Sequence, residues 1–429
     1  MNLLLISIFV IGYGFIAFEN SIKINKSATA MITGIVLWVV YILFADDKNG
    51  VNEQLAHHLG EISGILFFLL GAMGIVELID AHDGFEMITT RIVQLNKTKL
   101  LWITVLITFF LSSVIDNLTT AIVVGSLLRK LIYHEKDRVY FMGLVVIAAN
   151  AGGAWSPIGD VTTTMLWIGG QISAPAIIMK LFLPAITCTL VPLILVSTKM
   201  KGEVTRPESN KTHNKTRFTV KQKMIVFYSG IGSLLSVPIF KTFTHLPPYM
   251  GILFGLGILW IITEIIHGKN GHHEDDQFSV AYALRKIDSP SMFFFFGILI
   301  SIAALQTAGV LASAATWLTI HLNNNSLIVL SLGILSAIVD NVPLVAAVQA
   351  MYDLSTFPMN HYFWEFLAYA AGTGGSILII GSAAGVVAMG IEKITFMWYL
   401  KHMSLLALAG YFAGAVIYVL QDLLLFSVV

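Results

Sequence analysis

Three aspartates lie within apolar stretches of the sequence, where a charged side chain is costly. Asp116 and Asp340 are each followed by an asparagine, and Asp160 closes a glycine-rich segment. An ionised carboxylate at the centre of a bilayer costs roughly 2.5–3.5 kcal/mol or more. Serine or asparagine would cap a following helix equally well, so capping alone does not explain three acids. We therefore expect Asp116, Asp160 and Asp340 to bind a transported ion.

Further polar side chains accompany these acids. Small alkali cations require hard oxygen ligands, which carboxylate, amide, hydroxyl and backbone carbonyl groups provide. The candidates are Asn117, Asn150, Thr162, Thr163, Asn341 and Ser382. Polar side chains also hydrogen-bond between membrane helices without any ligand, so a purely structural role stays open for this second set.

Protons can compete with a cation for the same carboxylates. A site that crosses the membrane either protonated or loaded, and crosses poorly when empty and charged, exchanges the two ions. This hypothesis predicts that the apparent cation affinity weakens as pH falls. Glu77 and Asp80 are three residues apart, hence on one helical face, and are candidates for a proton path.

The elements that must hold these residues are membrane helices. Of the 429 residues, 56% are hydrophobic and 12% are charged, and the mean hydropathy is +0.81; soluble globular proteins are less apolar. Runs of roughly 17–25 apolar residues can cross a hydrocarbon core of ~30 Å. We expect an all-α integral membrane protein with about ten spans, at residues 2–18, 27–44, 61–79, 139–167, 175–198, 224–240, 248–267, 291–309, 363–391 and 396–420.

Two further apolar stretches, 100–131 and 327–351, carry Asp116 and Asp340 near their middle. If both stretches dip into the membrane and return, loops on one face carry 22 of the 25 Lys and Arg residues. The positive-inside rule makes that face cytoplasmic. We therefore predict two re-entrant hairpins, with both termini on the outer or periplasmic side of the cytoplasmic membrane.

The sequence resembles itself at about half its length. The matching segments are 67–71 with 293–297, 114–117 with 338–341, and 149–160 with 371–382. We expect two repeats, 1–198 and 224–429, joined by a basic cytoplasmic linker at 199–223. An odd number of crossings separates equivalent elements, so the repeats are inverted, an architecture of secondary transporters.

Each repeat also contains a span with a glycine-rich break, 139–167 in the first and 363–391 in the second. Irregular backbone at membrane depth is tolerated only where protein buries it or a water-filled cavity reaches it, so breaks and hairpin tips should meet at the ion site. Ser382 stands in the second break where Asp160 stands in the first. We therefore expect the first repeat to dominate ion binding.

Other polar residues give weaker signals. We expect Glu365 and Glu392, near span ends, to be solvated, and residues 272–276, two histidines and three acids, to be a solvated loop. His57 and His58 could sense external pH. We find no convincing Ser-His, Cys-His or His-Glu-x-x-His arrangement, so we expect no catalytic residue and no cofactor.

The sequences 113–120 and 150–163, together with Glu19, Lys26 and Trp38, resemble the NhaD-type sodium/proton antiporters of the wider ion-transporter superfamily. The likeness covers nearly the whole chain. It implies exchange of Na⁺ or Li⁺ for H⁺ at the inner membrane of a bacterium, with Na⁺ bound at Asp116, Asp160 and Asp340. For the superfamily it implies a homodimer in which a mobile domain, containing both hairpins and both broken helices, moves in an elevator-like manner against a scaffold.

Two related carrier types stay open as alternatives: Na⁺-coupled uptake of an organic anion, with the aspartates binding only the coupling ion, and arsenite efflux. The related dicarboxylate carriers hold their anion with Ser-Asn-Thr tips, where this chain has Asp116 and Asp340, which would repel it. The expected partners are small cations and the lipid bilayer, with no nucleic acid.

Overall fold

The computed structural model describes residues 1–17, 19–85, 95–207, 218–270 and 280–426, and these residues are helical apart from short connections. Seven helices are long and apolar enough to cross a membrane: α3 (Lys26–Phe44), α4 (Lys48–Ala81), α10 (Ala174–Ser197), α11 (Val220–Thr244), α12 (Pro248–Asn270), α14 (Ser289–Thr307) and α21 (Ser404–Gln421). With the shorter apolar α1 (Asn2–Ala17) and two broken helices, they occupy the ten predicted spans. The predicted class, an all-α membrane protein, is confirmed.

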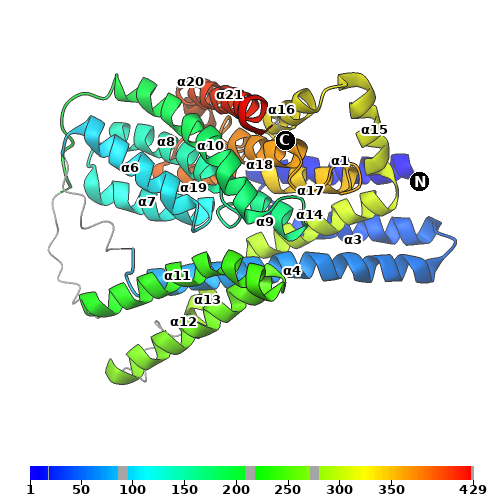
Figure 1. Cartoon of the computed structure of the whole chain (residues 1–429), viewed down its shortest axis with the longest axis horizontal. Coiled ribbons are helices and arrows are strands. Elements are labelled where there is room, and N and C mark those ends of the chain that lie inside the picture. The colour runs from blue at the N-terminus through cyan, green and yellow to red at the C-terminus, as the bar shows by residue number, and fades with distance from the viewer. Residues whose placement is uncertain (18, 86–94, 208–217, 271–279, 427–429) are drawn as a thin grey trace.

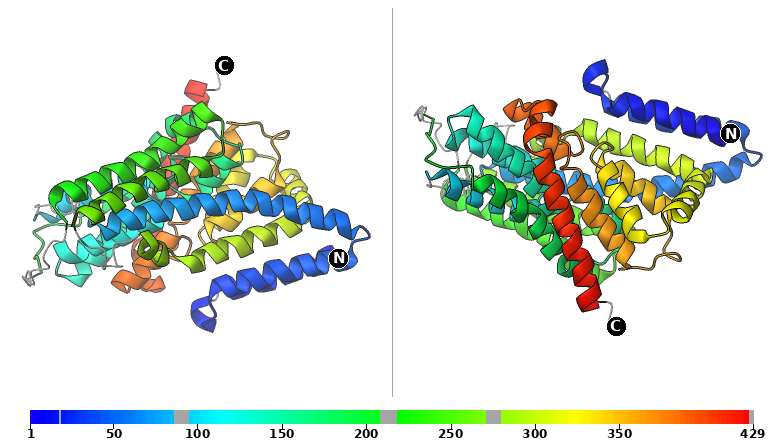
Figure 2. Two further views of the ribbon diagram at one scale, coloured as in Figure 1. Left: turned by 90° about the horizontal axis from the view of Figure 1, so that it is seen from below. Right: turned by 90° about the horizontal axis from the view of Figure 1, so that it is seen from above.

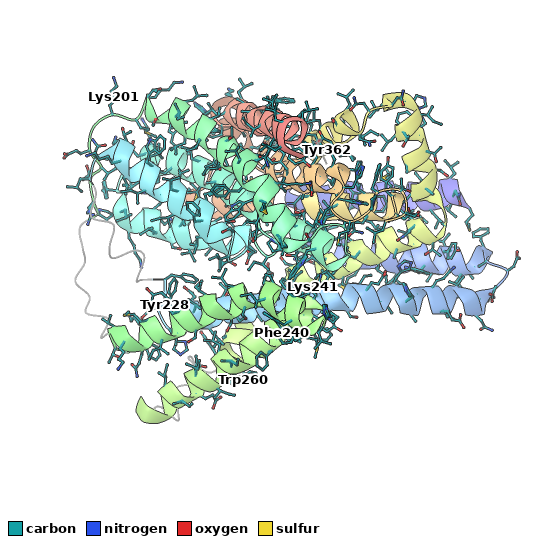
Figure 3. The ribbon with its side chains drawn as sticks, viewed as in Figure 1. Lys201, Tyr228, Phe240, Lys241, Trp260 and Tyr362 are labelled. Carbon is teal, nitrogen blue, oxygen red and sulfur yellow. The ribbon has the colours of Figure 1, made fainter. Side chains whose placement is uncertain are left out.

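Large apolar side chains lie on the outside of these helices. Tyr228 on α11 is 58% exposed and Trp260 on α12 is 38% exposed, and both are labelled in Figure 3. Leu405 and Phe412 are exposed in the same way along α21. Such a surface suits lipid rather than water as the surrounding solvent.

Both predicted hairpins are present. The first is α6 (Lys97–Ser112) with α7 (Asn117–Leu131), and the second is α16 (Asn325–Leu335) with α17 (Asn341–Met351). At 1.5 Å per residue these arms are roughly 16–24 Å long, which is too short for a core of ~30 Å. Each arm therefore reaches only part of the way across, as a re-entrant element does.

Both predicted broken helices are present as well. The first is α8 (Glu135–Ala154) with α9 (Val161–Ile168), and the second is α18 (Tyr362–Gly374) with α19 (Ala383–Glu392). Asp160 caps α9 by accepting a hydrogen bond from the Thr162 backbone N–H. Ser382 caps α19 in the same position. Each cap therefore satisfies one N–H group in the first turn of the second helical segment, where such groups lack a partner within the helix.

Each hairpin packs on its broken helix through the same contacts. The Ser112 hydroxyl donates to the Ala149 carbonyl oxygen at 2.5 Å, and the Ser336 hydroxyl donates to the Ala371 carbonyl oxygen at 2.9 Å. Glycine is required beside both contacts, because a Cβ at Gly152 would collide with the Phe109 carbonyl oxygen and one at Gly374 with the Gly333 carbonyl oxygen. The same contacts in both pairs are expected if the two hairpins and their broken helices are equivalent structural units.

The remaining helices form a support beside these units. In Figure 1, α4 runs along α11 and α12, while the hairpin α6–α7 lies with α8 on the other side of the molecule. α3 packs closely on α14 and also contacts α1. α1 lies at the edge of the molecule in both views of Figure 2. Short helices complete the chain: α2 (Glu19–Ile22), α13 (Val280–Lys286), α15 (Val310–Leu322), α20 (Phe396–His402) and the π-helix η2 (Asp422–Phe426).

The structure differs from the sequence prediction in two element boundaries and in one additional helix. The third span, predicted at 61–79, is the 34-residue α4, because polar residues in its first turns continue the helix beyond the apolar run. The last span, predicted at 396–420, divides at Met403, whose side chain is fully buried and would meet a Cβ at Gly143. Finally, α15 was not predicted, and it bends by 118° from α16. Hydropathy reports burial but not the bends that tertiary packing imposes.

Candidate ion site

The first hairpin tip presents Asp116 at the start of α7. Its carboxylate accepts hydrogen bonds from the Thr119 backbone N–H at 2.8 Å and from the Thr119 hydroxyl at 2.7 Å. Asp116 therefore caps the helix, and the same two bonds fix its orientation. Thr119 belongs to the predicted tip segment, but the sequence analysis did not predict its hydrogen bonds to Asp116. Its position three residues after the cap is the signal that could have revealed them.

Asp160 accepts hydrogen bonds from more residues than the other two acids do, and it is 2% exposed. Its carboxylate accepts from the Thr162 N–H at 2.9 Å and the Thr162 hydroxyl at 3.0 Å. The side-chain amides of Asn117 and Asn341 also donate to it, at 2.9 and 3.3 Å. Asn117 comes from the first hairpin tip and Asn341 from the second, so both repeats meet at one carboxylate.

Asn150 connects this carboxylate cluster to the second break. Its amide oxygen accepts from Asn117 at 3.0 Å, and its nitrogen donates to the hydroxyls of Ser376 and Ser382 at 3.0 and 2.8 Å. Asn150 and Ser382, both predicted, are therefore brought to the site. Ser376 was missed as an individual residue, although the break that contains it was predicted.

A cavity of about 70 Å³ lies at the centre of this arrangement. Asp116, Asp160 and Asp340 all line it, together with Asn117 and Asn341. Three acids separated by up to 224 residues in the sequence thus surround one small space. Carboxylate and amide oxygens around a space of this size form a donor set suited to a hard cation.

The second tip presents Asp340 differently from Asp116. Its carboxylate accepts from the Val342 N–H at 3.4 Å, and its own backbone N–H donates to the Tyr13 hydroxyl oxygen at 3.2 Å. Asp340 is half-buried, as is Asp116. Tyr13 ties the second tip to α1, a contact that no sequence pattern indicated.

Lys26, at the start of α3, also lines the cavity. Its ammonium group lies 4.6 Å from the centre of the Phe294 ring, a favourable contact between a cation and an aromatic face. The sequence analysis noted Lys26 only through the family resemblance and gave it no role. One positive charge therefore stands beside three acids.

The other predicted residues lie outside the cavity lining. The Thr163 hydroxyl donates to the Asp160 carbonyl oxygen at 2.9 Å and so supports the first turn of α9. Glu77 is half-buried and Asp80 is exposed on α4, whereas Met73 and Val76 of the same helix line the cavity. The proton path through Glu77 and Asp80 stays a prediction.

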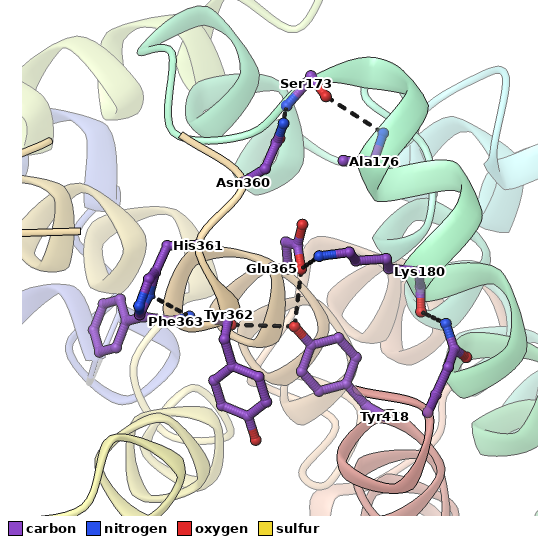
Figure 4. Close-up of polar contacts among 10 residues, drawn as sticks. Ser173, Ala176, Lys180, Asn360, His361, Tyr362, Phe363, Glu365 and Tyr418 are labelled. Atoms are coloured by element: carbon purple, nitrogen blue, oxygen red, sulfur yellow. Dashed lines mark hydrogen bonds and ion pairs between the residues drawn. The ribbon is translucent and has the colours of Figure 1, made fainter. Parts of the chain in front are cut away.

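Two acids expected to be solvated are buried and paired. Glu392 is 2% exposed and accepts from Arg129 at 3.0 Å and from Arg138 at 2.9 Å. Glu365 is fully buried and accepts from the Lys180 ammonium at 2.8 Å and the Tyr418 hydroxyl at 3.1 Å (Figure 4). The expectation of solvated carboxylates is therefore wrong. Their partners come from other helices, which the local sequence does not reveal. Residues 272–276 lie outside the described residues.

Two hairpins and two broken helices that meet around three acids in a bundle of apolar helices define a secondary transporter. The comparisons with known proteins agree. The CitMHS family, described as "Citrate transporter", matches residues 13–364. Sodium/proton antiporter 2 of Arabidopsis thaliana is 48% identical over 96% of this chain and 97% of its own length. The Na⁺/H⁺ antiporter NhaD of Vibrio cholerae is 30% identical over 97% of this chain and 91% of its own length.

The chain therefore belongs to the family of the NhaD-type sodium/proton antiporters, within the larger group that the citrate transporter description covers. Its fold is similar to that of the YdaH transporter of Alcanivorax borkumensis, with a TM-score of 0.53 at 10% identity, covering 93% of this chain and 98% of the other. The predicted family is confirmed.

Proposed function

We propose that this protein exchanges Na⁺, or Li⁺, for H⁺, with cation and protons competing for Asp116, Asp160 and Asp340. In the loaded state the carboxylates and the amide oxygens of Asn117 and Asn341 ligate the cation. When the cation leaves, protons neutralise the acids. The empty, charged site crosses poorly because transfer of uncompensated carboxylates through the bilayer centre is costly.

The convergence of both hairpin tips on Asp160 carries this proposal. Asn117 and Asn341 each direct an amide nitrogen to that carboxylate, which leaves each amide oxygen as the atom that can ligate a cation. A cation bound beside Asp160 would thus contact side chains from both repeats. Movement of either tip changes the ligands of the same ion.

The size and charge of the cavity favour a cation over an organic anion. Its volume is about 70 Å³, whereas pockets for small organic molecules measure roughly 300–1,000 Å³. Three carboxylates line it against one ammonium group, that of Lys26. A carboxylate substrate would therefore meet both too little space and a net repulsive field.

We further propose that the protein lies in the inner membrane of a bacterium, as the family resemblance implies. We propose that both termini lie outside, as the Lys and Arg distribution predicts. The division into repeats at the linker 199–223, the homodimer and the elevator-like movement stay predictions, as does the absence of a cofactor. Reaction of single cysteines on either face with a thiol reagent that cannot cross the membrane, in a background without Cys188, tests the orientation.

Proton flux in proteoliposomes with a preset pH gradient tests the exchange. NaCl, LiCl or KCl is added to wild type, to Asp160→Asn and to Asp116→Asn. We expect Na⁺ or Li⁺ to dissipate the gradient with wild type and with neither variant, and the half-saturating Na⁺ concentration to rise as pH falls. If no cation moves protons between about pH 6 and 9, the exchanger proposal is wrong.

The citrate transporter description of the matching family keeps Na⁺-coupled anion uptake as a second candidate. The same proteoliposomes can be supplied with radiolabelled citrate and an inward Na⁺ gradient. Accumulation of citrate that requires Na⁺ would favour this candidate, and arsenite in the same assay tests efflux of that anion.

A further inference from the structure

We propose a second cation site, for a divalent transition metal such as Zn²⁺, formed by His57, His58 and Glu61 on α4. One possible ligand atom from each of the three side chains lies within 4.8 Å of the others. On a helix, residues three and four apart face the same side, and Glu61 stands in these positions relative to the two histidines. Imidazole nitrogens with one carboxylate suit Zn²⁺ rather than Na⁺.

Thr307 on α14 holds His58 in the form that binds a metal. The Thr307 hydroxyl has a single proton, and it donates that proton to the Ala303 carbonyl oxygen at 2.8 Å. In its 3.2 Å contact with His58 Nε2, the same oxygen must accept. His58 therefore carries a proton on Nε2, which leaves Nδ1 as the nitrogen that can bind a metal. A metal-bound histidine commonly donates its other N–H in this way.

The Nδ1 atom of His58 faces the Glu61 carboxylate. Nδ1 lies 3.4 Å from Glu61 Oε2, and His57 Nδ1 lies 3.9 Å from the same oxygen. A proton on His58 Nδ1 joins the two atoms as an ion pair, and a metal ion that displaces this proton would bind the same nitrogen and oxygen. Zinc–ligand bonds of about 2.0–2.1 Å in a tetrahedral site place the ligand atoms about 3.3–3.4 Å apart. His58 and Glu61 already have this spacing.

His57 completes the site by a small movement. Its side chain is 73% exposed and that of Glu61 is 63% exposed, whereas that of His58 is only 17% exposed. The exposed pair can adjust by rotation while His58 stays fixed by Thr307. With three protein ligands, water fills the remaining positions, so the metal binds reversibly from solution.

The proposed site lies at the rim of the larger cavity of the molecule. His58 and Glu61 line this space of about 400 Å³, whose other walls come from α14, from Met165 on α9 and from Ala346 on α17. The same two helices begin at Asp160 and Asp340. A divalent metal fixed at this rim opposes the approach of another cation by Coulomb repulsion. We infer that the metal inhibits transport from this side, a consequence that depends on the proposed exchange.

Isothermal titration calorimetry of the purified full-length protein with ZnCl₂ tests the site. Every variant is made in a His272→Ala/His273→Ala background, so that the histidines of 272–276 do not contribute. We expect one equivalent of Zn²⁺ to bind, His58→Ala and Glu61→Gln each to weaken binding by tenfold or more, and Thr307→Val to weaken it about tenfold. His321→Ala, which removes an exposed histidine on α15, is the control and should bind as the background does.

Unchanged Zn²⁺ affinity in both His58→Ala and Glu61→Gln would overturn the proposal. Glu61→Gln keeps the size of the side chain, so it tests the ligand even if His58→Ala destabilises the protein. In proteoliposomes, Zn²⁺ on the side of the 400 Å³ cavity should slow exchange by wild type and not by Glu61→Gln. If wild type shows no exchange at all, the proposed function is wrong, while the calorimetry still decides the metal site.

Discussion

The two glycine-rich breaks have the same packing and different chemistry. Ser112 and Ser336 make equivalent hydrogen bonds, from the two hairpins to the two broken helices. At the cap of the following helix, however, the first break has Asp160 and the second has Ser382. The two breaks therefore pack in the same way, and only the first carries a charged cap.

The second repeat supports that charge. Asn341 donates to Asp160 from the second tip, and Ser382 accepts from Asn150. Farther along, Glu392 at the end of α19 binds Arg129 of the first hairpin and Arg138 of α8. A buried carboxylate with two guanidinium partners ties the second broken helix to the first hairpin, so these elements are expected to move together.

The largest expected effect tests the asymmetry directly. Asp160→Asn should lower the exchange rate about 100-fold or more, roughly 2.7 kcal/mol, because it removes the carboxylate that both tips address. Ser382→Ala should lower it less than about fivefold, since the Asn150 nitrogen keeps its bond to Ser376. Proton flux in proteoliposomes measures both. Equal losses would mean that the two breaks contribute equally.

Exchanging the two residues should not restore transport. In the double variant Asp160→Ser/Ser382→Asp, Asn117 and Asn341 still direct their donors to position 160, where no carboxylate remains. We expect exchange as low as in Asp160→Asn, measured in the same assay. Ser382→Asp alone serves as the control for an added charge. Recovery of activity would show that the position of the acid matters less than its presence.

The shared frame predicts symmetric losses of stability. Gly152→Ala and Gly374→Ala each push a methyl group into a backbone carbonyl oxygen of the neighbouring hairpin, and overpacking of this kind costs about 1–3 kcal/mol. Thermal denaturation in detergent should show similar decreases for both. Gly257→Ala on α12 is the control, because a Cβ there meets nothing within 4 Å. A large difference between the first two would indicate unequal frames.

The smallest expected effects are on the Na⁺ affinity, and they should differ between the two hairpin tips. Asn117 donates to Asp160 at 2.9 Å and also to Asn150, whereas Asn341 donates only at 3.3–3.5 Å. Loss of a hydrogen bond to a charged group costs about 1.5–3 kcal/mol. We expect Asn117→Ala to raise the half-saturating Na⁺ concentration about tenfold or more, and Asn341→Ala, whose hydrogen bonds are longer and weaker, to raise it by less than about tenfold. The reverse order would place the dominant tip in the second repeat.

Much of the architecture could be predicted from the sequence. The hairpins, the broken helices and the Asp160/Ser382 difference follow from polar interruptions of apolar runs and from the internal repeat. The extent of α4 and the bend at α15 did not follow, since helix length beyond an apolar run and direction after a turn depend on neighbouring helices.

The sequence by itself determined the membrane class and the positions of the hairpins and breaks, and it predicted the three acids of the ion site. These properties depend on the order of apolar, glycine and charged residues along the chain. Only the tertiary structure decided that Asn117 and Asn341 meet at Asp160, that Lys26 lines the same cavity, and that Glu365 and Glu392 are buried. The contact between Asn341 and Asp160 spans 181 residues, and no local pattern encodes such a contact, because it arises from how separate helices pack.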